Sequence, residues 1–235
     1  MTDFDVPGAR LQTEYSNEGG HPVVQLHGLT SSLERDRVLD LDLGRGLSGT
    51  RLLRYDARGH GRSTGRPVAD DYRWPRLAQD LLALLDVWFP GERVHGVGPS
   101  MGCATLLHAA LLDPGRFSGL TLMVPPTAWE TRAAKAHDYE RSAEAVEAHG
   151  LELLLRAQAA APAPPATAGA PDTVPDVRTD LLPWVFCGAA RSDLPDRESL
   201  RSIDLPTTIL AWTDDPAHPL STAGALLDLL PRATL

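Results

Sequence analysis

The stretch VHGVGPSMG, Val94–Gly102, joins a short apolar run to the longer apolar run Met101–Leu112. The first run is typical of a buried strand, and the second is typical of a helix that packs deep against a sheet. Between them, Gly98–Gly102 reads G-x-S-x-G, a pattern that sets a serine on a tight strand-to-helix turn with its hydroxyl above the sheet edge. Glycines flank this serine because a Cβ there would collide with neighbouring backbone. The stretch therefore predicts that Ser100 is a nucleophile.

Two other interpretations of this turn stay open. It also fits an ordinary glycine-rich connection, and Gly96, Gly98 and Gly102 resemble a nucleotide-binding turn. Such a turn lies near the start of its domain, and the next strand ends in an acidic residue that holds a ribose. Here the next strand ends at Pro125-Pro126 instead, which favours the nucleophile.

Short aliphatic runs alternate with amphipathic ones along most of the chain. Runs of a few residues closed by Gly, Asp or Pro predict buried strands. The expected strands are 23–27, 51–55, 93–97, 118–124 and 207–212, and the expected helices are 75–88, 101–112 and 220–230. This order predicts an α/β fold with a mostly parallel sheet flanked by helices.

Residues 127–180 differ from the rest. Two helical patterns, 129–149 and 151–160, are followed by a Pro/Ala-rich stretch at 157–171 that cannot bury a core. We therefore expect an insertion at 127–180, with residues 1–126 and 181–235 forming the core domain.

Composition narrows the functional classes. The chain has 235 residues, 43% of them hydrophobic, and a formal net charge of −9. This charge disfavours nucleic acid and anionic membranes as partners. Cys103 and Cys187 give no disulfide framework, and no metal-ligand spacing is present. We expect a soluble cytoplasmic protein that binds a small molecule and uses no metal or dedicated cofactor; the oligomeric state does not follow from the sequence.

A second loop belongs with the serine. His27-Gly28-Leu29-Thr30 follows the strand that begins at Val23. Its turn can bring the Leu29 N–H opposite Ser100, so that the Leu29 and Met101 amides form an oxyanion hole. We interpret His27 itself as a structural histidine.

Four motifs occur in order: LHGLTSS (26–32), YDARGHGRS (55–63), VHGVGPSMG (94–102) and LAWTDDPAHP (210–219). With them the chain resembles the α/β-hydrolase fold family, and it is similar to the small esterases and enol-lactone hydrolases. The resemblance implies a serine nucleophile at Ser100, a backbone oxyanion hole and a lid at 127–180. It places the carboxylate that orients the base at Asp215, with Asp214 as the alternative. Asp56, Arg58, His60 and Ser63 match a motif that braces the neighbouring turn.

The chain departs from the family pattern at its end. The family's catalytic histidine follows one more strand, whereas Pro231–Leu235 resembles only the start of that strand. We therefore expect the last strand, the last helix and the base to be missing, and activity to be impaired. A shortened copy of an active hydrolase and a naturally short form both fit this pattern. His218, three residues after Asp215, is expected to be a turn or capping residue.

The predicted function is hydrolysis of a carboxylic ester or lactone through an acyl-enzyme. The alternatives are a non-catalytic hydrolase-like binding protein, and related chemistry such as hydrolysis of a carbon–carbon bond or a thioester. Trp129, Trp184 and Phe186 are candidates for pocket walls or for plain core residues, and Arg132 for a solvated helix charge or a partner of a substrate carboxylate.

Overall fold

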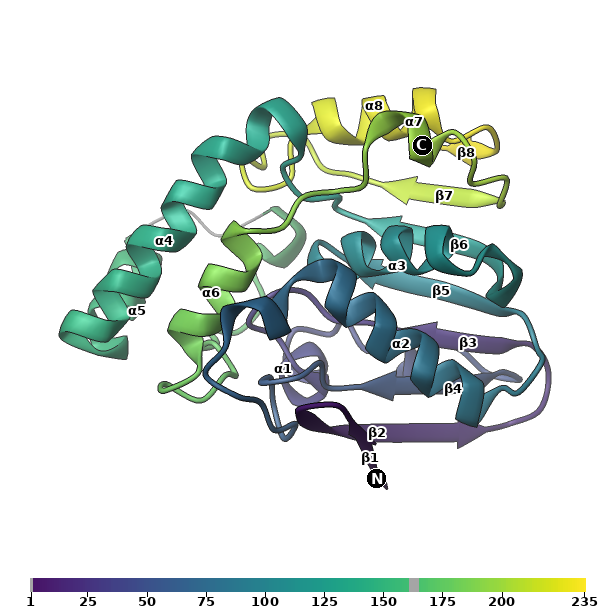
Figure 1. Cartoon of the computed structure of the whole chain (residues 1–235), viewed down its shortest axis with the longest axis horizontal. Helices are drawn as coiled ribbons and strands as arrows, with labels where there is room; N and C mark the ends of the chain where they lie inside the picture. The colour runs from purple at the N-terminus through teal and green to yellow at the C-terminus, as the bar shows by residue number, and fades with distance from the viewer. Residues whose placement is uncertain (1, 161–164) are drawn as a thin grey trace.

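One mixed sheet forms the centre of the molecule, as Figure 1 shows for this computed structural model. The structure describes residues 2–160 and 165–235, and within them eight strands pair in the order β1-β2-β4-β3-β5-β6-β7-β8. All neighbours from β4 to β8 are parallel, whereas β2 runs antiparallel to both β1 and β4. The strands are β1 (Thr2–Val6), β2 (Ala9–Asn17), β3 (Pro22–Gln25), β4 (Arg51–Tyr55), β5 (Val94–Pro99), β6 (Phe117–Met123), β7 (Thr207–Leu210) and β8 (Ala233–Thr234). The predicted fold class is confirmed.

The helices alternate with the parallel strands. They are α1 (Leu33–Val38), α2 (Trp74–Trp88), α3 (Met101–Leu112), α4 (Arg132–His149), α5 (Leu151–Ala159), α6 (Leu182–Ala190), α7 (Arg197–Leu200) and α8 (Leu220–Leu229). Every strand and helix that the sequence predicts in the core is present, with bounds that agree to within two residues. The stretch 231–235, expected to begin a strand, contains β8, which pairs with β7.

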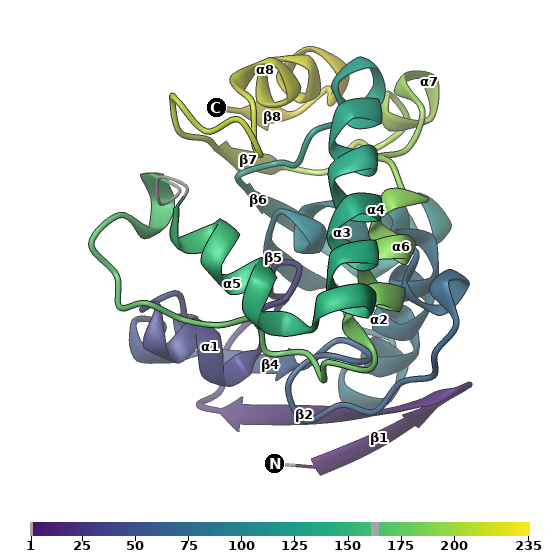
Figure 2. The same ribbon diagram turned by 90° about the vertical axis from the view of Figure 1, so that its left-hand side faces the viewer.

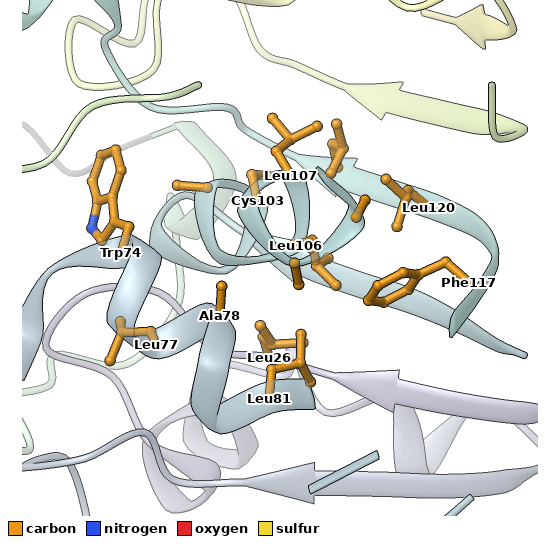
Figure 3. Close-up of a cluster of buried hydrophobic side chains, with 14 of the residues drawn as sticks. Leu26, Trp74, Leu77, Ala78, Leu81, Cys103, Leu106, Leu107, Phe117 and Leu120 are labelled. Atoms are coloured by element: carbon orange, nitrogen blue, oxygen red, sulfur yellow. The ribbon is translucent and has the colours of Figure 1, made fainter. Parts of the chain in front are cut away.

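The main core lies between the sheet and the helices α2 and α3. Figure 3 shows Leu106 and Leu107 of α3 close to Phe117 and Leu120 of β6. All four side chains are fully buried. Burial on this scale is the main stabilising contribution to such a fold, at about 25 cal/mol for each Å² of apolar surface. It fixes α3, and therefore the turn before it, against the sheet.

The chain reverses direction across the sheet between β3 and β5. From β3 the chain continues through α1 to β4 on one side, and from β4 it crosses through α2 to β5 on the other. In open parallel sheets such a reversal opens a crevice beyond the carboxyl ends of the two strands. The loops after β3 and β5, which carry Leu29 and Ser100, meet there.

Helices α4, α5 and α6, which lie between β6 and β7 in the sequence, form a layer beyond the carboxyl ends of the strands, at the left of Figure 1 and in front in Figure 2. Here α4 and α5 pack with α6 around buried side chains that include Val146, Leu154 and Phe186. The insertion bounds 127–180 and the division into two parts stay predictions. Residues 161–164 of the expected Pro/Ala-rich stretch 157–171 lie outside the described residues.

No helix in the described part of the chain combines the length and the apolar character needed to cross a membrane.

Candidate active site

The turn between β5 and α3 holds Ser100 in an unusual backbone conformation, with φ 51° and ψ −109°. A residue with a side chain rarely adopts positive φ, and such a conformation persists only where its surroundings enforce it. The turn is also too close for side chains at its flanking glycines. A Cβ on Gly98 would lie 2.9 Å from the carbonyl carbon of Gly102, and one on Gly102 would lie 3.1 Å from Leu26 Cβ. The G-x-S-x-G spacing is therefore what allows this bend.

Ser100, His218 and Asp215 form a continuous hydrogen-bonded row. Ser100 Oγ lies 2.9 Å from His218 Nε2, and His218 Nδ1 lies 2.8 Å from Asp215 Oδ2. A carboxylate only accepts hydrogen bonds, so the imidazole proton is on Nδ1, which donates a hydrogen bond to Asp215. In the neutral ring Nε2 is then free of a proton and accepts the hydrogen bond from the Ser100 hydroxyl. This arrangement can take a proton from the serine.

Local geometry explains why acid and histidine lie together. The His218 N–H donates to the Asp215 carbonyl at 3.1 Å, which closes a turn and puts the two side chains on one side. The Ala217 N–H donates to Asp215 Oδ1 at 3.0 Å, which orients the carboxylate. Asp215 is buried, whereas Asp214 is exposed and has a φ of 62°. The geometry thus favours Asp215 over Asp214 as the partner of the histidine.

The contact between His218 and Ser100 is the feature that the sequence reasoning missed. The sequence predicts a turn residue, and the turn is present, but the imidazole also reaches the serine, which lies 118 positions earlier in the chain. A signal was available: in D-P-A-H the acid and the histidine are three residues apart, a spacing that one turn brings to the same side. The distance across the sheet to Ser100 could not be read from the sequence.

The loop after β3 is held by His27. Ala57 N–H donates to His27 Nε2 at 2.9 Å, so Nδ1 carries the proton and donates to the Gly28 carbonyl at 2.8 Å. Burial lowers the pKa of His27 to about 4, so the ring stays neutral. The interpretation of His27 as structural agrees with these contacts. The Ser31 N–H also donates to the Gly28 carbonyl, at 3.1 Å.

This anchoring sets the direction of the Leu29 N–H. In a trans peptide the C=O and N–H point in opposite directions. With the Gly28 carbonyl turned toward His27 and Ser31, the Leu29 N–H of the same peptide points the other way. Gly28 lies beside the serine, since a Cβ on it would come 3.9 Å from Ser100 Cβ. Met101 is the first residue of α3, and the first N–H groups of a helix have no partner within it.

The motif at 56–63 braces the same loops. Asp56 accepts from the N–H groups of Leu33 and Arg62, at 2.7 and 2.9 Å. The buried guanidinium of Arg58 donates twice to Asp80, each time at 2.7 Å. These contacts agree with a structural interpretation of the motif.

The side chains considered for the pocket are placed in packing contacts. Arg132 is buried and donates to the Ser192 and Ala189 carbonyls, so the expected solvated charge is wrong. Phe186 stacks on Tyr139 within the α4–α6 cluster, and Trp184 packs at the edge of that cluster. Trp129 packs against the main core.

Clusters of three His, Cys, Asp or Glu side chains suited to a metal ion do not occur in residues 2–160 and 165–235.

Two relatives show what the chain is similar to in sequence. The esterase YbfF of Escherichia coli (strain K12) is 30% identical over 124 residues, which are 52% of this chain and 46% of that protein. The 3-oxoadipate enol-lactonase 1 of Acinetobacter baylyi is 30% identical over 190 residues, 73% of this chain and 64% of that one. The chain thus spans about half to two thirds of the length of these relatives.

The fold recurs among solved structures. The crystal structure of a hydrolase from Pseudomonas aeruginosa superposes with a TM-score of 0.78 at 24% identity, covering 99% of this chain and 87% of that one. A family model described as the alpha/beta hydrolase fold matches residues 21–164. Since that match covers more than half of the sequence, the chain belongs to the α/β-hydrolase fold family.

Proposed function

We propose that this protein hydrolyses a carboxylic ester or lactone through an acyl-enzyme on Ser100. The observation that carries the proposal is the hydrogen-bonded row from Asp215 through His218 to Ser100. A serine hydroxyl is a weak nucleophile until a neighbouring base takes its proton, and a base is effective when a third group orients it. In this row Ser100 is the nucleophile, His218 is the base and Asp215 is the group that orients the base. In our proposal His218 takes the place of the base that the sequence analysis expected to be missing, so we no longer expect activity to be impaired for lack of a base.

The reaction divides into two steps. Ser100 Oγ attacks the carbonyl carbon while His218 Nε2 takes the hydroxyl proton, and Asp215 stabilises the imidazolium. The carbonyl oxygen becomes an oxyanion that accepts from the Leu29 and Met101 N–H groups. When the tetrahedral intermediate collapses, His218 returns the proton to the leaving alkoxide, which stays tethered if the substrate is a lactone. A water molecule activated by His218 then attacks the acyl-enzyme and frees Ser100.

The names of the relatives support the substrate class. One is an esterase and another an enol-lactonase, and both names describe attack on an acyl–oxygen bond. A cytoplasmic location stays a prediction. Thioester or carbon–carbon bond hydrolysis would use the same groups.

A fluorophosphonate probe tests the proposal directly, because it reacts only with an activated serine. We expect the unaltered chain to be labelled and Ser100→Ala to be unlabelled. His218→Gln should lower both labelling and the turnover of p-nitrophenyl acetate by about 10⁴-fold or more. The matched control is His149→Gln, which changes an exposed histidine at the end of α4 and should leave both rates unchanged.

Each outcome has a clear meaning. A folded chain that is not labelled supports the non-catalytic binding alternative and overturns the proposal. Labelling that persists in His218→Gln at the unaltered rate shows that another group is the base. That result overturns the assignment of His218 and leaves the role of Ser100 standing.

A further inference from the structure

The segment just before α6 returns across the strand ends and binds the loop after β3. The Asp176 N–H donates to the Thr30 carbonyl at 2.9 Å, and the Asp176 carboxylate accepts from Ser32 Oγ at 2.5 Å. The Asp176 carbonyl accepts from the Gly61 N–H at 2.7 Å, and Val177 forms a β-bridge with His60. One residue of the inserted segment is therefore bonded to the loops after both β3 and β4.

The loop that Asp176 binds is strained. Thr30 has a φ of 62°, which is rare for any residue with a side chain and rarest for β-branched ones. Together with the hydrogen bond from Ser31 N–H to the Gly28 carbonyl, this φ makes residues 28–31 a turn whose third position favours glycine. Such a conformation is energetically unfavourable and persists only where other contacts hold it. Asp176 supplies one of the hydrogen bonds to the Thr30 carbonyl and the acceptor for Ser32 Oγ.

Arg35 of α1 adds a second connection. Its guanidinium donates to the Thr30 carbonyl at 3.2 Å and to Thr173 Oγ1 at 2.9 Å. The Thr30 carbonyl thus accepts from both Asp176 and Arg35. The inserted segment therefore binds the turn at the Thr30 carbonyl, and His27 binds it at the Gly28 carbonyl.

We propose that Asp176 is a positioning residue for the oxyanion hole. The Leu29 N–H belongs to the 28–31 turn, so its direction holds only while that turn keeps its strained shape. When the Asp176 carboxylate is lost, Ser32 Oγ loses its acceptor, although the Asp176 N–H and Arg35 still donate to the Thr30 carbonyl. With Ser32 less firmly held, the strained turn samples negative φ at Thr30 more often, which turns the neighbouring peptides. The inserted segment therefore completes the oxyanion hole as well as covering the site, and its displacement would switch off acylation. This inference rests on the proposed function.

The test compares two carboxylates of the same segment. Asp176→Ala removes the contact with Ser32, whereas Asp176→Asn keeps an oxygen that can accept from it. The control is Asp180→Ala, which breaks an exposed ion pair with Arg178 inside the segment and touches neither loop. Each full-length variant is assayed for kcat and KM with p-nitrophenyl acetate, for inhibition by an alkyl boronic acid, and for amide hydrogen exchange of residues 26–33.

For Asp176→Ala we expect kcat to fall about tenfold to a hundredfold, part of the 10²- to 10³-fold that one oxyanion donor contributes. KM should change less than twofold, and boronate affinity should fall by the same factor as kcat, because the boronate oxyanion uses the same donors. Exchange at residues 26–33 should accelerate. Asp176→Asn should recover most of each loss, and Asp180→Ala should match the unaltered chain.

Either of two results overturns the inference. One is an Asp176→Ala variant with unaltered kcat, and the other is a variant in which exchange at residues 26–33 is unaltered and only the thermal stability is lowered. Absence of turnover in the unaltered chain overturns the proposed function and the catalytic consequence together. In that case the exchange data still decide whether Asp176 holds the turn.

Discussion

Replacing Gly98 by alanine should damage the active site more than its position in a strand suggests. The added Cβ would lie 2.9 Å from the carbonyl carbon of Gly102 and 3.0 Å from its Cα. Carbon atoms in good contact are about 3.5–4.0 Å apart, so the start of α3 must withdraw by about 0.5 Å or more. Both atoms are backbone, and no side-chain rotation relieves the contact. The withdrawal moves Ser100 and the Met101 N–H together.

The expected magnitudes follow from this displacement. A misplacement of 1 Å in a catalytic group can lower a rate by about 10²-fold, so we expect kcat for Gly98→Ala to fall about tenfold. Overpacking of this kind lowers the free energy of unfolding by about 1–3 kcal/mol. The assays are p-nitrophenyl acetate turnover and urea unfolding followed by tryptophan fluorescence.

Two glycines provide controls. A Cβ on Gly96, two residues earlier in β5, would meet the Leu106 side chain at 2.5 Å, so Gly96→Ala should lower stability but leave kcat within about twofold. A Cβ on Gly224 in α8 meets no described atom within 4 Å, so Gly224→Ala should raise stability by about 0.5–1 kcal/mol. If Gly98→Ala keeps the kcat of Gly96→Ala, the close approach to Gly102 does not position the serine and the reasoning is wrong.

Two buried groups give further predictions. His27 has a folded pKa of about 4 against about 6.5 when unfolded, so the unfolded state binds the proton first and stability falls by roughly 3 kcal/mol as pH drops from 6.5 to 4. Burial raises the pKa of Asp36 to about 7, and this group opposes the trend because the folded state then binds its proton first. The effect of His27 is therefore isolated by measuring the free energy of unfolding in urea for the unaltered chain and for His27→Asn across this pH range. The difference between the two should shrink toward low pH, and a constant difference would contradict the prediction. Arg58→Met leaves the Asp80 carboxylate buried without its bidentate partner and should lower the free energy of unfolding by about 3–5 kcal/mol, with Asp80→Leu added to it restoring most of the loss; no restoration would show that the pair is not the cause.

The sequence was sufficient for the parts of the fold where local pattern and burial agree. The parallel strands from β3 to β7 are short apolar runs closed by Gly, Asp or Pro, and the elbow at Ser100 is specified by two flanking glycines. The β1–β2 hairpin was not predicted, although Pro7-Gly8 and alternating apolar residues were present. The helix α6 was missed because Leu182–Ala190 is apolar on all sides, which short buried strands also are.

The candidate site divides in the same way. Ser100, Asp215 and the two amide donors were predicted from motifs that each lie within a few residues. The role of His218 depends on how close the loop after β7 comes to the loop after β5, a distance set by β6 and by packing. Asp176 accepts a hydrogen bond from Ser32, which lies 144 positions earlier in the chain, so no local pattern could indicate the contact.

The shared turn of Asp215 and His218 leads to an unusual prediction about the acid. Asp215 Oδ1 accepts from the Ala217 N–H and Oδ2 accepts from His218 Nδ1. In Asp215→Asn the Ala217 N–H holds the amide oxygen, so the amide nitrogen faces Nδ1 and donates to it. The imidazole proton then moves to Nε2, which faces Ser100. A protonated Nε2 can no longer accept the serine proton. In a serine protease the same wrong tautomer lowers kcat by about 10⁴-fold.

Asp215→Ala imposes no tautomer, so His218 is less well oriented but still samples the form that can accept the proton. We therefore expect Asp215→Ala to hydrolyse p-nitrophenyl acetate faster than Asp215→Asn, although asparagine is the closer substitute in shape. Both variants must be compared at equal folded fraction, measured by circular dichroism, because the buried acid also contributes to the turn. A faster Asp215→Asn would mean that the Ala217 N–H does not fix the amide, and that Asp215 acts on His218 through its charge alone.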